Sequence, residues 1–455
     1  MFLKTIKTPG LAHLSYILGS GNQAAVIDPR RDIEIYIDIA KQQECQISHI
    51  FETHRNEDLL SGAAILSARS GAEVLHGPNA DGEIQYAKTV KEGHRVSLDN
   101  LTLEIVETPG HTKDSVCILL FDNNFAAGPV GIFTGDTLFV GDVGRTDFYP
   151  DESEHVAGLL YDSLQKIKSR AAQAIIYPAH GAGSVCGDGM ADREFSTVAH
   201  EIKNNPLLAI GNRADFIQQK VAEQHYIPPY FSTMERLNMQ GASACFSARI
   251  ISPVTAKQLV KMHQQGVKLI DVRCIESFLG AHIPSSFCLP VSMITAYIGW
   301  LFSPDDRLVI IADDSDMASV AALHLARVGY DNVDYYFSAK IAEVAASGMD
   351  FATLNVANAK HVKQLADDNW TLLDVRKVTE YEKIHIAGSE HIFLGHLAKK
   401  ITDLSPQGHY ITMCASGMRA TVAAAYLQAN GFENIKVFMG SMGAWQGMDF
   451  PVEHG

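Results

Sequence analysis

The C-terminal half of the chain contains an internal repeat, which is the strongest constraint on its fold. Leu269-Ile-Asp-Val-Arg273 returns as Leu372-Leu-Asp-Val-Arg376, and Ala281-His-Ile-Pro284 returns as Ile384-His-Ile-Ala387, which is a period of about 100 residues. Each copy alternates short apolar runs with helical stretches, a pattern typical of a parallel sheet flanked by helices. The repeat therefore predicts two homologous α/β domains.

The part of the chain that precedes the repeat has an α/β pattern of its own. Short strands alternate with helices, and the segment 101–107 alternates apolar and polar residues with period two, so we expect a half-exposed strand there. Sequence patterning changes between residues 242 and 252, where we expect a domain boundary. Three domains follow, with expected bounds at residues 1–245, 252–352 and 355–455.

The charge balance excludes two classes of partner. The net charge of -15 argues against nucleic acid and against an anionic membrane surface, because both require a dense basic surface. A membrane span would need about 18 uninterrupted apolar residues, and no such run occurs. The seven cysteines are scattered and never form a Cys-x-x-Cys pair, so we interpret them as reduced thiols of a cytoplasmic protein.

Histidines and aspartates gather in four segments of the first domain, each at the end of an expected strand. These segments are Thr53-His-Arg-Asn-Glu-Asp-Leu59, Thr108-Pro-Gly-His-Thr112, Thr134-Gly-Asp-Thr137 and Tyr177-Pro-Ala-His180. Together they resemble the metallo-β-lactamase fold superfamily, whose ligands lie on loops of an αββα sandwich. That family's first motif, His-x-His-x-Asp-His, supplies ligands to two zinc ions. Here Asn56 and Leu59 replace two of its histidines, and neither is a good zinc ligand.

The remaining residues predict a site for one metal ion. The resemblance leaves His54, His111 and Asp136 as the inner ligands, which is the two-histidine, one-carboxylate triad of non-haem Fe(II) oxygenases. We therefore expect one Fe(II) per chain. Asp58 and His180 have lost their partners in the motif and are expected to hydrogen-bond to the ligands from behind.

Within that superfamily the first domain resembles the persulfide dioxygenases, through Gly141-Asp-Val-Gly-Arg-Thr-Asp-Phe148 and Ile176-Tyr-Pro-Ala-His180. The resemblance implies that Arg145 contacts the thiol carrier of the substrate. Glutathione-using members have a tyrosine where this chain has Ala182, so glutathione, coenzyme A and other carriers all stay open. Cys186 lies in a glycine-rich loop and is expected to be unreactive.

A reactive cysteine is predicted in the last domain. Cys414 follows an apolar strand and opens the loop Cys414-Ala-Ser-Gly-Met-Arg419, which runs into a helix. Backbone N–H groups and the positive helix end favour the thiolate, and Arg419 adds a fixed charge. The loop is Cys-x4-Arg, one residue shorter than the Cys-x5-Arg loop of phosphatases, so it fits sulfur rather than phosphate.

The last domain as a whole resembles a rhodanese. The resemblance implies that Cys414 and Arg419 are catalytic and that Asp374 and Arg376 brace the loop. It also implies that sulfur compounds bind at the four residues between Cys414 and Arg419, namely Ala415, Ser416, Gly417 and Met418.

The middle copy lacks this chemistry. Ala312 stands in place of the cysteine and Met317 in place of the arginine, while Asp313, Asp314 and Asp316 add negative charge. We interpret it as a pseudo-rhodanese that spaces, orients or oligomerises its neighbours, and we expect a homo-oligomer, a dimer or a tetramer.

The sequence thus predicts an iron-dependent persulfide dioxygenase fused to a sulfurtransferase. A low-molecular-weight persulfide and O2 would give sulfite, and Cys414 would carry sulfane sulfur in the formation or use of thiosulfate, as in sulfide detoxification. Two alternatives stay open: a zinc-dependent thioester hydrolase of the glyoxalase II type with a passenger rhodanese, and a sulfur-carrier scaffold whose iron site is vestigial.

Overall fold

The computed structural model describes residues 1–125, 127–184, 189–242, 251–365 and 369–454, and it divides into two compact units. The first unit comprises residues 1–248 with 327–329, and the second comprises residues 249–326 with 330–455. Most of the expected boundary segment, and also Cys186, lie outside the described residues. Among the described residues, no helix is both long and apolar enough to span a bilayer.

Two six-stranded sheets form the centre of the first unit. In the first sheet the order follows the sequence: β1 (Phe2–Thr8), β2 (His13–Ser20), β3 (Gln23–Ile27), β4 (Gln46–Glu52), β5 (Glu73–His76) and β6 (Lys88–Thr89). The second sheet has the order β12 (Ser196–Thr197), β11 (Ile175–Pro178), β10 (Gly131–Gly135), β9 (Val116–Asp122), β8 (Leu101–Glu107) and β7 (Arg95–Leu98). Both sheets mix parallel and antiparallel neighbours.

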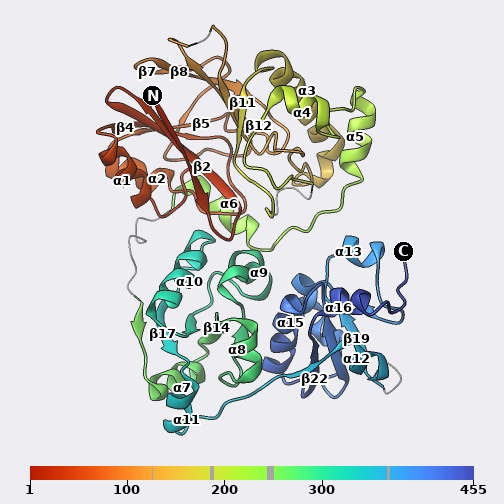
Figure 1. Ribbon diagram of the computed structural model, residues 1–455. Helices are drawn as coiled ribbons and strands as arrows, with labels where there is room; N and C mark the ends of the chain where they lie inside the picture. The colour runs from red at the N-terminus through yellow and green to blue at the C-terminus, as the bar shows by residue number, and fades with distance from the viewer. Residues whose placement is uncertain (126, 185–188, 243–250, 366–368, 455) are drawn as a thin grey trace. The chain divides into compact units, whose positions relative to one another are not determined.

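Helices cover the outer faces of both sheets (Figure 1). These helices are α1 (Glu34–Gln42), α2 (Ala63–Ser70), α3 (Ser153–Arg170), α4 (Val198–Asn204) and α5 (Arg213–Val221). Helix α6 (Phe231–Gln240) lies instead at one end of the sandwich (Figure 1), where its Asn238 bonds to the loop that follows β4. Strand periodicity sends alternate residues to opposite faces. Thus Leu18 packs between the sheets against Leu103, whereas its neighbour Ile17 packs outward with Tyr36 of α1. On the far side, Leu119 packs with Leu160 of α3. These layers confirm the predicted αββα sandwich.

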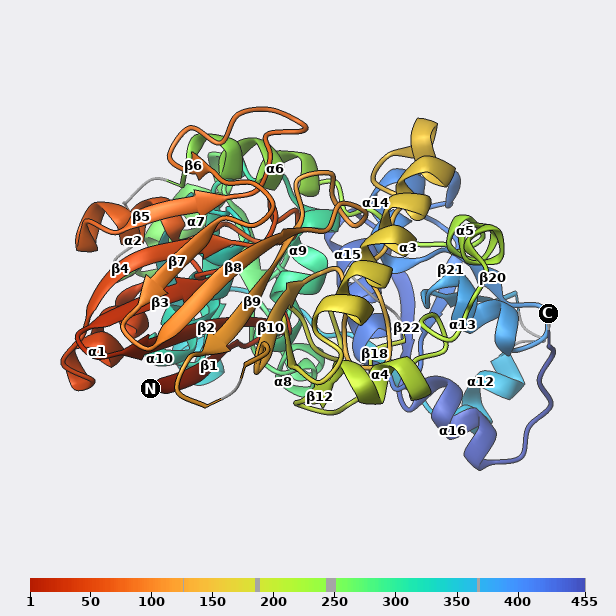
Figure 2. The same cartoon turned by 90° about the horizontal axis from the view of Figure 1, so that it is seen from above.

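Strand β8 differs from the expectation of a half-exposed strand. Five of its seven residues are buried, and the remaining two are half-buried. Its charged residue Glu104 is buried as well, because Arg95 and Arg170 both form ion pairs with its carboxylate. The strand runs beside β7 and β9 in the second sheet, as Figure 2 shows. Alternation of residue types was therefore a poor guide to exposure here, because two arginines neutralise the polar face.

The second unit contains two five-stranded parallel sheets with one topology. One has the strand order β13 (Ser252–Pro253), β17 (Val333–Ser338), β16 (Leu308–Ala312), β14 (Lys268–Asp271) and β15 (Phe287–Cys288). The other has the order β18 (Asn355–Ala357), β22 (Asn434–Phe438), β21 (His409–Met413), β19 (Thr371–Asp374) and β20 (Glu390–His391). The identical strand order confirms the internal repeat.

Helices flank each of these sheets. The first sheet has α7 (Ala256–Gln264), α8 (Ile275–Gly280), α9 (Ile294–Leu301), α10 (Ser315–Arg327) and α11 (Ile341–Ala346). The second has α12 (Ala359–Leu365), α13 (Val378–Lys383), α14 (Leu397–Lys400), α15 (Met418–Ala429) and α16 (Ser441–Gly447). Helix α15 begins directly after the Cys414 loop and is followed by Gly431, whose φ of 87° requires a residue without a Cβ.

Candidate metal centre and sulfur-transfer loop

The three predicted metal ligands converge at one edge of the sandwich. His54 follows β4, His111 follows β8 and Asp136 follows β10, and all three are buried. One ligand atom of each lies within 4.8 Å of the others. Asp136 Oδ2 lies 3.5 Å from His111 Nε2 and 3.9 Å from His54 Nε2. The structure therefore brings the predicted triad together.

Hydrogen bonds behind the two imidazoles fix which nitrogen faces the centre. His54 Nδ1 lies 2.9 Å from Thr53 Oγ1, which donates its own proton to Asp28 Oδ2. His111 Nδ1 donates to the carbonyl oxygen of Arg145, at 3.0 Å. Both Nε2 atoms are buried and have no partner in hydrogen-bonding geometry among the described residues. This is the arrangement of metal-binding histidines, so the residues present fit a single divalent ion.

The protonation tendencies of His54 and Asp136 agree with metal binding. Burial lowers the pKa of His54 and so favours the neutral imidazole that metals bind. Burial by itself would raise the pKa of Asp136, but the surrounding imidazoles, His180 first among them, hold that pKa well below its usual value. The carboxylate is therefore ionised and available as a ligand.

His180 bridges two carboxylates, those of Asp136 and Asp58. Its Nδ1 lies 2.8 Å from Asp136 Oδ1, and its Nε2 lies 3.0 Å from Asp58 Oδ2. Because opposite ring nitrogens face the two carboxylates, Asp58 and Asp136 do not converge on a common point beside His180. A role of Asp58 and His180 behind the ligands stays a prediction.

The substituted motif positions are locked into the protein. Asn56 and Leu59 are buried, and the side-chain amide of Asn238 in α6 donates to both of their carbonyl oxygens, at 2.7 and 2.8 Å. Asn238 also accepts a hydrogen bond from the Ser61 backbone N–H, at 2.9 Å. One amide side chain thus clamps the whole ligand-bearing loop.

Glu57 is a functional candidate that the sequence reasoning did not select. It is buried, and its Oε1 lies 3.2 Å from His111 Nε2, while its Oε2 lies 3.9 Å from His54 Nε2. Burial opposes ionisation of Glu57, yet the adjacent His111 lowers its pKa below the usual value. An acidic residue inside the His54 to Asp58 motif was the signal that could have identified it.

Arg145 lies beside the centre but turns its guanidinium elsewhere. The guanidinium is buried and forms two hydrogen bonds with Asp147, at 2.7 and 2.6 Å, and a third with the carbonyl oxygen of Tyr226. It also stacks over the ring of Phe148. Its contribution to the metal site in this structure is the backbone carbonyl that orients His111. A contact between Arg145 and the thiol carrier stays a prediction.

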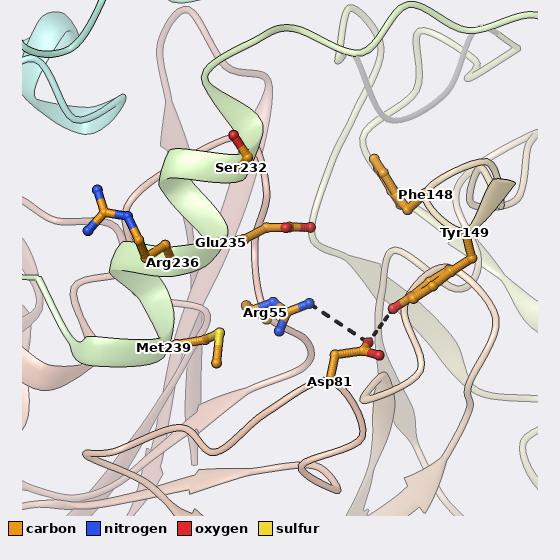
Figure 3. Close-up of a pocket in the computed structure, with 8 residues that line it drawn as sticks. All are labelled: Arg55, Asp81, Phe148, Tyr149, Ser232, Glu235, Arg236 and Met239. Carbon is orange, nitrogen blue, oxygen red and sulfur yellow. Dashed lines mark hydrogen bonds and ion pairs between the residues drawn. The ribbon is translucent and has the colours of Figure 1, made fainter. Parts of the chain in front are cut away.

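A cavity of about 340 Å³ lies next to the metal centre (Figure 3). Phe148 forms part of its wall and also packs edge-to-face on His111, with 5.3 Å between the ring centroids. Its other lining residues are Arg55, Asp81, Tyr149, Ser232, Glu235, Arg236 and Met239. Figure 3 shows Arg55 reaching toward Asp81 while Glu235 projects from α6 into the same space. The cavity therefore contains charges of both signs, and the ring of Phe148 lies between it and the metal ligand His111.

The thiol of Cys414 sits at the mouth of α15. The side chain is buried, and the backbone N–H of Gly417 donates to its sulfur at 3.1 Å. Ser441 Oγ accepts from the Cys414 backbone N–H at 3.0 Å and lies 3.9 Å from the sulfur. Gly417 has a φ of 119°, a left-handed conformation that lets the loop turn its N–H inward. The loop thus holds the sulfur against N–H and O–H donors.

The rest of the predicted loop surrounds this thiol. Ala415 and Ser416 accept backbone hydrogen bonds from the segment that begins α16, at 3.0 and 2.9 Å, while Met418 is exposed. Arg419 forms two hydrogen bonds with Glu380, at 2.6 and 2.8 Å. Burial alone would lower the pKa of Arg419, but Glu380 raises it above its usual value, so the side chain is a permanent cation.

The middle copy also contributes to this site. Burial raises the pKa of Tyr297 in α9, and the positive charge of Arg419 acts against that shift. The same α9 places Trp300 edge-to-face against Phe393 of the last copy, with 5.5 Å between the ring centroids. Sequence reasoning missed Tyr297 because nothing local links it to the loop.

An aspartate and arginine pair occupies the same place in both copies. Arg376 binds Asp374 through Nη2 at 2.6 Å and the carbonyl oxygen of Ile384 at 2.7 Å. In the middle copy the corresponding bonds of Arg273 to Asp271 and Ala281 measure 2.7 and 2.8 Å. Because Asp374 pairs in register with Met413, the residue before Cys414, the arginine ties the adjacent strand end rather than the loop itself.

Comparison with known proteins places both halves in families. Residues 8–180 match the metallo-beta-lactamase superfamily profile, and residues 255–337 and 358–448 match the rhodanese-like domain. A crystal structure of a metallo-beta-lactamase from Staphylococcus aureus is similar over 74% of this chain and 98% of its own, with a TM-score of 0.67 and 28% identity.

Two curated relatives each match less than half of this chain. A hydroxyacylglutathione hydrolase of Tolumonas auensis is 30% identical over 36% of this chain and 60% of its own length. A mitochondrial persulfide dioxygenase of Bos taurus is 28% identical over 46% of this chain and 77% of its own length.

The chain is a fusion of a metallo-beta-lactamase superfamily domain with two rhodanese-like domains. Its first domain is related both to persulfide dioxygenases and to hydroxyacylglutathione hydrolases.

Proposed function

We propose that the protein is an Fe(II)-dependent persulfide dioxygenase joined to a sulfurtransferase that works through Cys414. The observation that carries the proposal is the pairing of two sites in one chain. The first is a triad of His54, His111 and Asp136 for one metal ion, beside which His180 contacts Asp58. The other is a buried cysteine inside a short loop at a helix N-terminus.

The triad residues supply the donor set for the oxidation. Two imidazoles and one carboxylate suit Fe(II), which when bound would let a sulfur ligand and O2 react side by side. Thr53 and the Arg145 carbonyl keep the Nε2 atoms of His54 and His111 aimed at the centre. Phe148 screens His111 from solvent and separates it from the charged cavity, where we place the thiol carrier of the persulfide.

The balanced reaction consumes one persulfide, one O2 and one water. R–S–SH + O2 + H2O gives R–SH + SO3²⁻ + 2 H⁺, so the terminal sulfur is oxidised, O2 is reduced and the S–S bond breaks. The sulfurtransferase step then joins sulfite to a second sulfane sulfur. A second R–S–SH first transfers its outer sulfur to the Cys414 thiolate and leaves as the thiol. The Cys414 persulfide then transfers that sulfur to sulfite, which forms thiosulfate and leaves the Cys414 thiolate. The Gly417 N–H and Arg419 stabilise the negative charge during this transfer.

Oxygen uptake by metal-loaded protein tests the proposal. Protein reconstituted anaerobically with one Fe(II) per chain should consume O2 when glutathione persulfide or coenzyme A persulfide is added, and sulfite and thiosulfate should form. Zinc-loaded protein is the matched control and should consume none. Absence of O2 uptake with every persulfide, at full iron occupancy, would reject the dioxygenase function.

A zinc-dependent thioester hydrolase is the second candidate. The observation in its favour is the 30% identity to a hydroxyacylglutathione hydrolase. The replacement of two motif histidines by Asn56 and Leu59 weighs against it, because hydrolysis of that type uses two zinc ions. Two zinc ions per chain, together with hydrolysis of a hydroxyacylglutathione thioester, would establish this candidate instead.

A further inference from the structure

The side chain of Glu57 faces the two histidines of the metal-binding triad. Glu57 lies between Asn56 and Asp58 in the loop that carries His54, and its side chain is buried. Its two oxygens lie 3.2 Å from His111 Nε2 and 3.9 Å from His54 Nε2. The carboxylate therefore faces the two nitrogens that face the centre, not the hydrogen-bonded nitrogens behind them.

The distances fit donors that share one ion. Metal–ligand bonds of about 2.1 Å place neighbouring donors about 3 Å apart and opposite donors about 4 Å apart. The contacts of the two Nε2 atoms with Glu57, at 3.2 and 3.9 Å, resemble their contacts with Asp136, at 3.5 and 3.9 Å. The shorter contact, 3.2 Å, joins a carboxylate oxygen of Glu57 to the ring nitrogen of His111 that faces the centre.

Charge leads to the same arrangement. A buried carboxylate is stabilised by a nearby positive charge, and a divalent ion at the centre would supply one. Two neutral imidazoles with two carboxylates balance a divalent ion completely. The triad alone would leave the ion with one uncompensated positive charge in a buried site.

We propose that Glu57 is a fourth protein ligand of the metal ion held by His54, His111 and Asp136. Binding through one carboxylate oxygen would leave two positions of an octahedron, which is enough for one sulfur ligand and one O2. The inference deepens the proposed function, because it concerns the same metal site. It requires only that the site binds a divalent ion.

Co(II) binding to the full-length protein tests the fourth ligand without measuring activity. The Glu57→Gln and Glu57→Ala variants should bind Co(II) at least about tenfold more weakly than the parent, and their visible d–d absorption should change in position and intensity. Added acetate should partly restore the parent spectrum in Glu57→Ala. Glu201→Gln is the matched control, because Glu201 is equally buried but bonds to Ser196 and Asn205. It should bind Co(II) like the parent.

Parent-like Co(II) affinity and absorption in Glu57→Gln would overturn the proposal. If the Glu57 variants do not fold, a crystal structure of the Co(II)-loaded parent decides the question. A Glu57 oxygen within about 2.2 Å of the ion supports the proposal, and a water in that position overturns it. A parent protein that shows the Glu57-dependent spectrum but oxidises no persulfide would reject the dioxygenase function and leave the fourth ligand intact.

Discussion

The two rhodanese-like copies share a scaffold and differ in one loop. Both have the same strand order, and both keep an aspartate and arginine pair with almost the same bond lengths. Strand register places Ala312 where the last copy has Cys414, because Ile311 pairs with Asp271 as Met413 pairs with Asp374. The comparison teaches that packing preserves the fold of a copy, whereas its chemistry depends on a few loop residues that can be lost separately.

The largest effect should come from removing the nucleophile of the active copy. Cys414→Ser should reduce sulfur transfer from thiosulfate by at least about 1000-fold, because the hydroxyl cannot accept sulfane sulfur at this site. Oxygen uptake with a persulfide should persist while thiosulfate formation stops. Cys274→Ser, an exposed cysteine of the middle copy, is the control and should leave transfer unchanged. Transfer that survives in Cys414→Ser would mean that the active copy has been misidentified.

The shared aspartates should matter for stability in both copies. Asp271→Asn and Asp374→Asn each leave a buried arginine without its counter-charge, which costs about 3–5 kcal/mol. Denaturant unfolding of the two full-length variants should therefore show losses of similar size. A loss confined to Asp374→Asn would show that the middle copy has relaxed its scaffold as well as its chemistry.

A smaller effect is expected from the cation of the active loop. Arg419→Lys should slow sulfur transfer about 10- to 100-fold, because lysine cannot keep the paired bonds to Glu380 and still present its charge to the loop. Stopped-flow measurement of the transfer step with sulfite as acceptor gives the rate. Equal rates for the parent and Arg419→Lys would remove Arg419 from the catalytic group.

Tyr297→Phe serves as the comparison for that measurement. It removes a hydroxyl that the middle copy directs toward Arg419, so the transfer rate should fall only a few-fold, on the order of one hydrogen bond. A larger loss than that of Arg419→Lys would show that the middle copy participates in the chemistry.

The smallest effect is expected from restoring a cysteine to the middle copy, which should produce no sulfur transfer. Ala312→Cys in the Cys414→Ser background restores the cysteine to the inactive copy, but Asp313 and Asp314 follow it and Met317 replaces the arginine. The added thiol would meet negative charge instead of a cation, so transfer should stay at background. Recovered transfer would show that a cysteine at this strand end suffices and that the loop charges are incidental.

Sequence patterns predicted the architecture and the three main metal-ligand candidates. They failed where the direction of a side chain determines whether it faces the site. The triad follows strands whose ends meet at one edge, so motif positions were enough for His54, His111 and Asp136. Glu57 escaped selection because an irregular loop has no period that tells which side chains face inward.

Long-range contacts account for the remaining differences. Glu104 is buried in β8 because two arginines distant in sequence neutralise it. Arg145 pairs with Asp147, and Tyr297 lies near Arg419 although it belongs to the other copy. Such partners depend on the folded arrangement, which local spacing does not encode.

The amide clamp of Asn238 has a consequence for dissecting the protein. The superfamily match ends at residue 180, yet the backbone at Asn56 and Leu59 is held by a helix that begins at Phe231. A fragment cut to the matched segment would keep His54, His111 and Asp136 but lose the brace of the loop that carries His54. Minimal versions of this domain should therefore extend through α6.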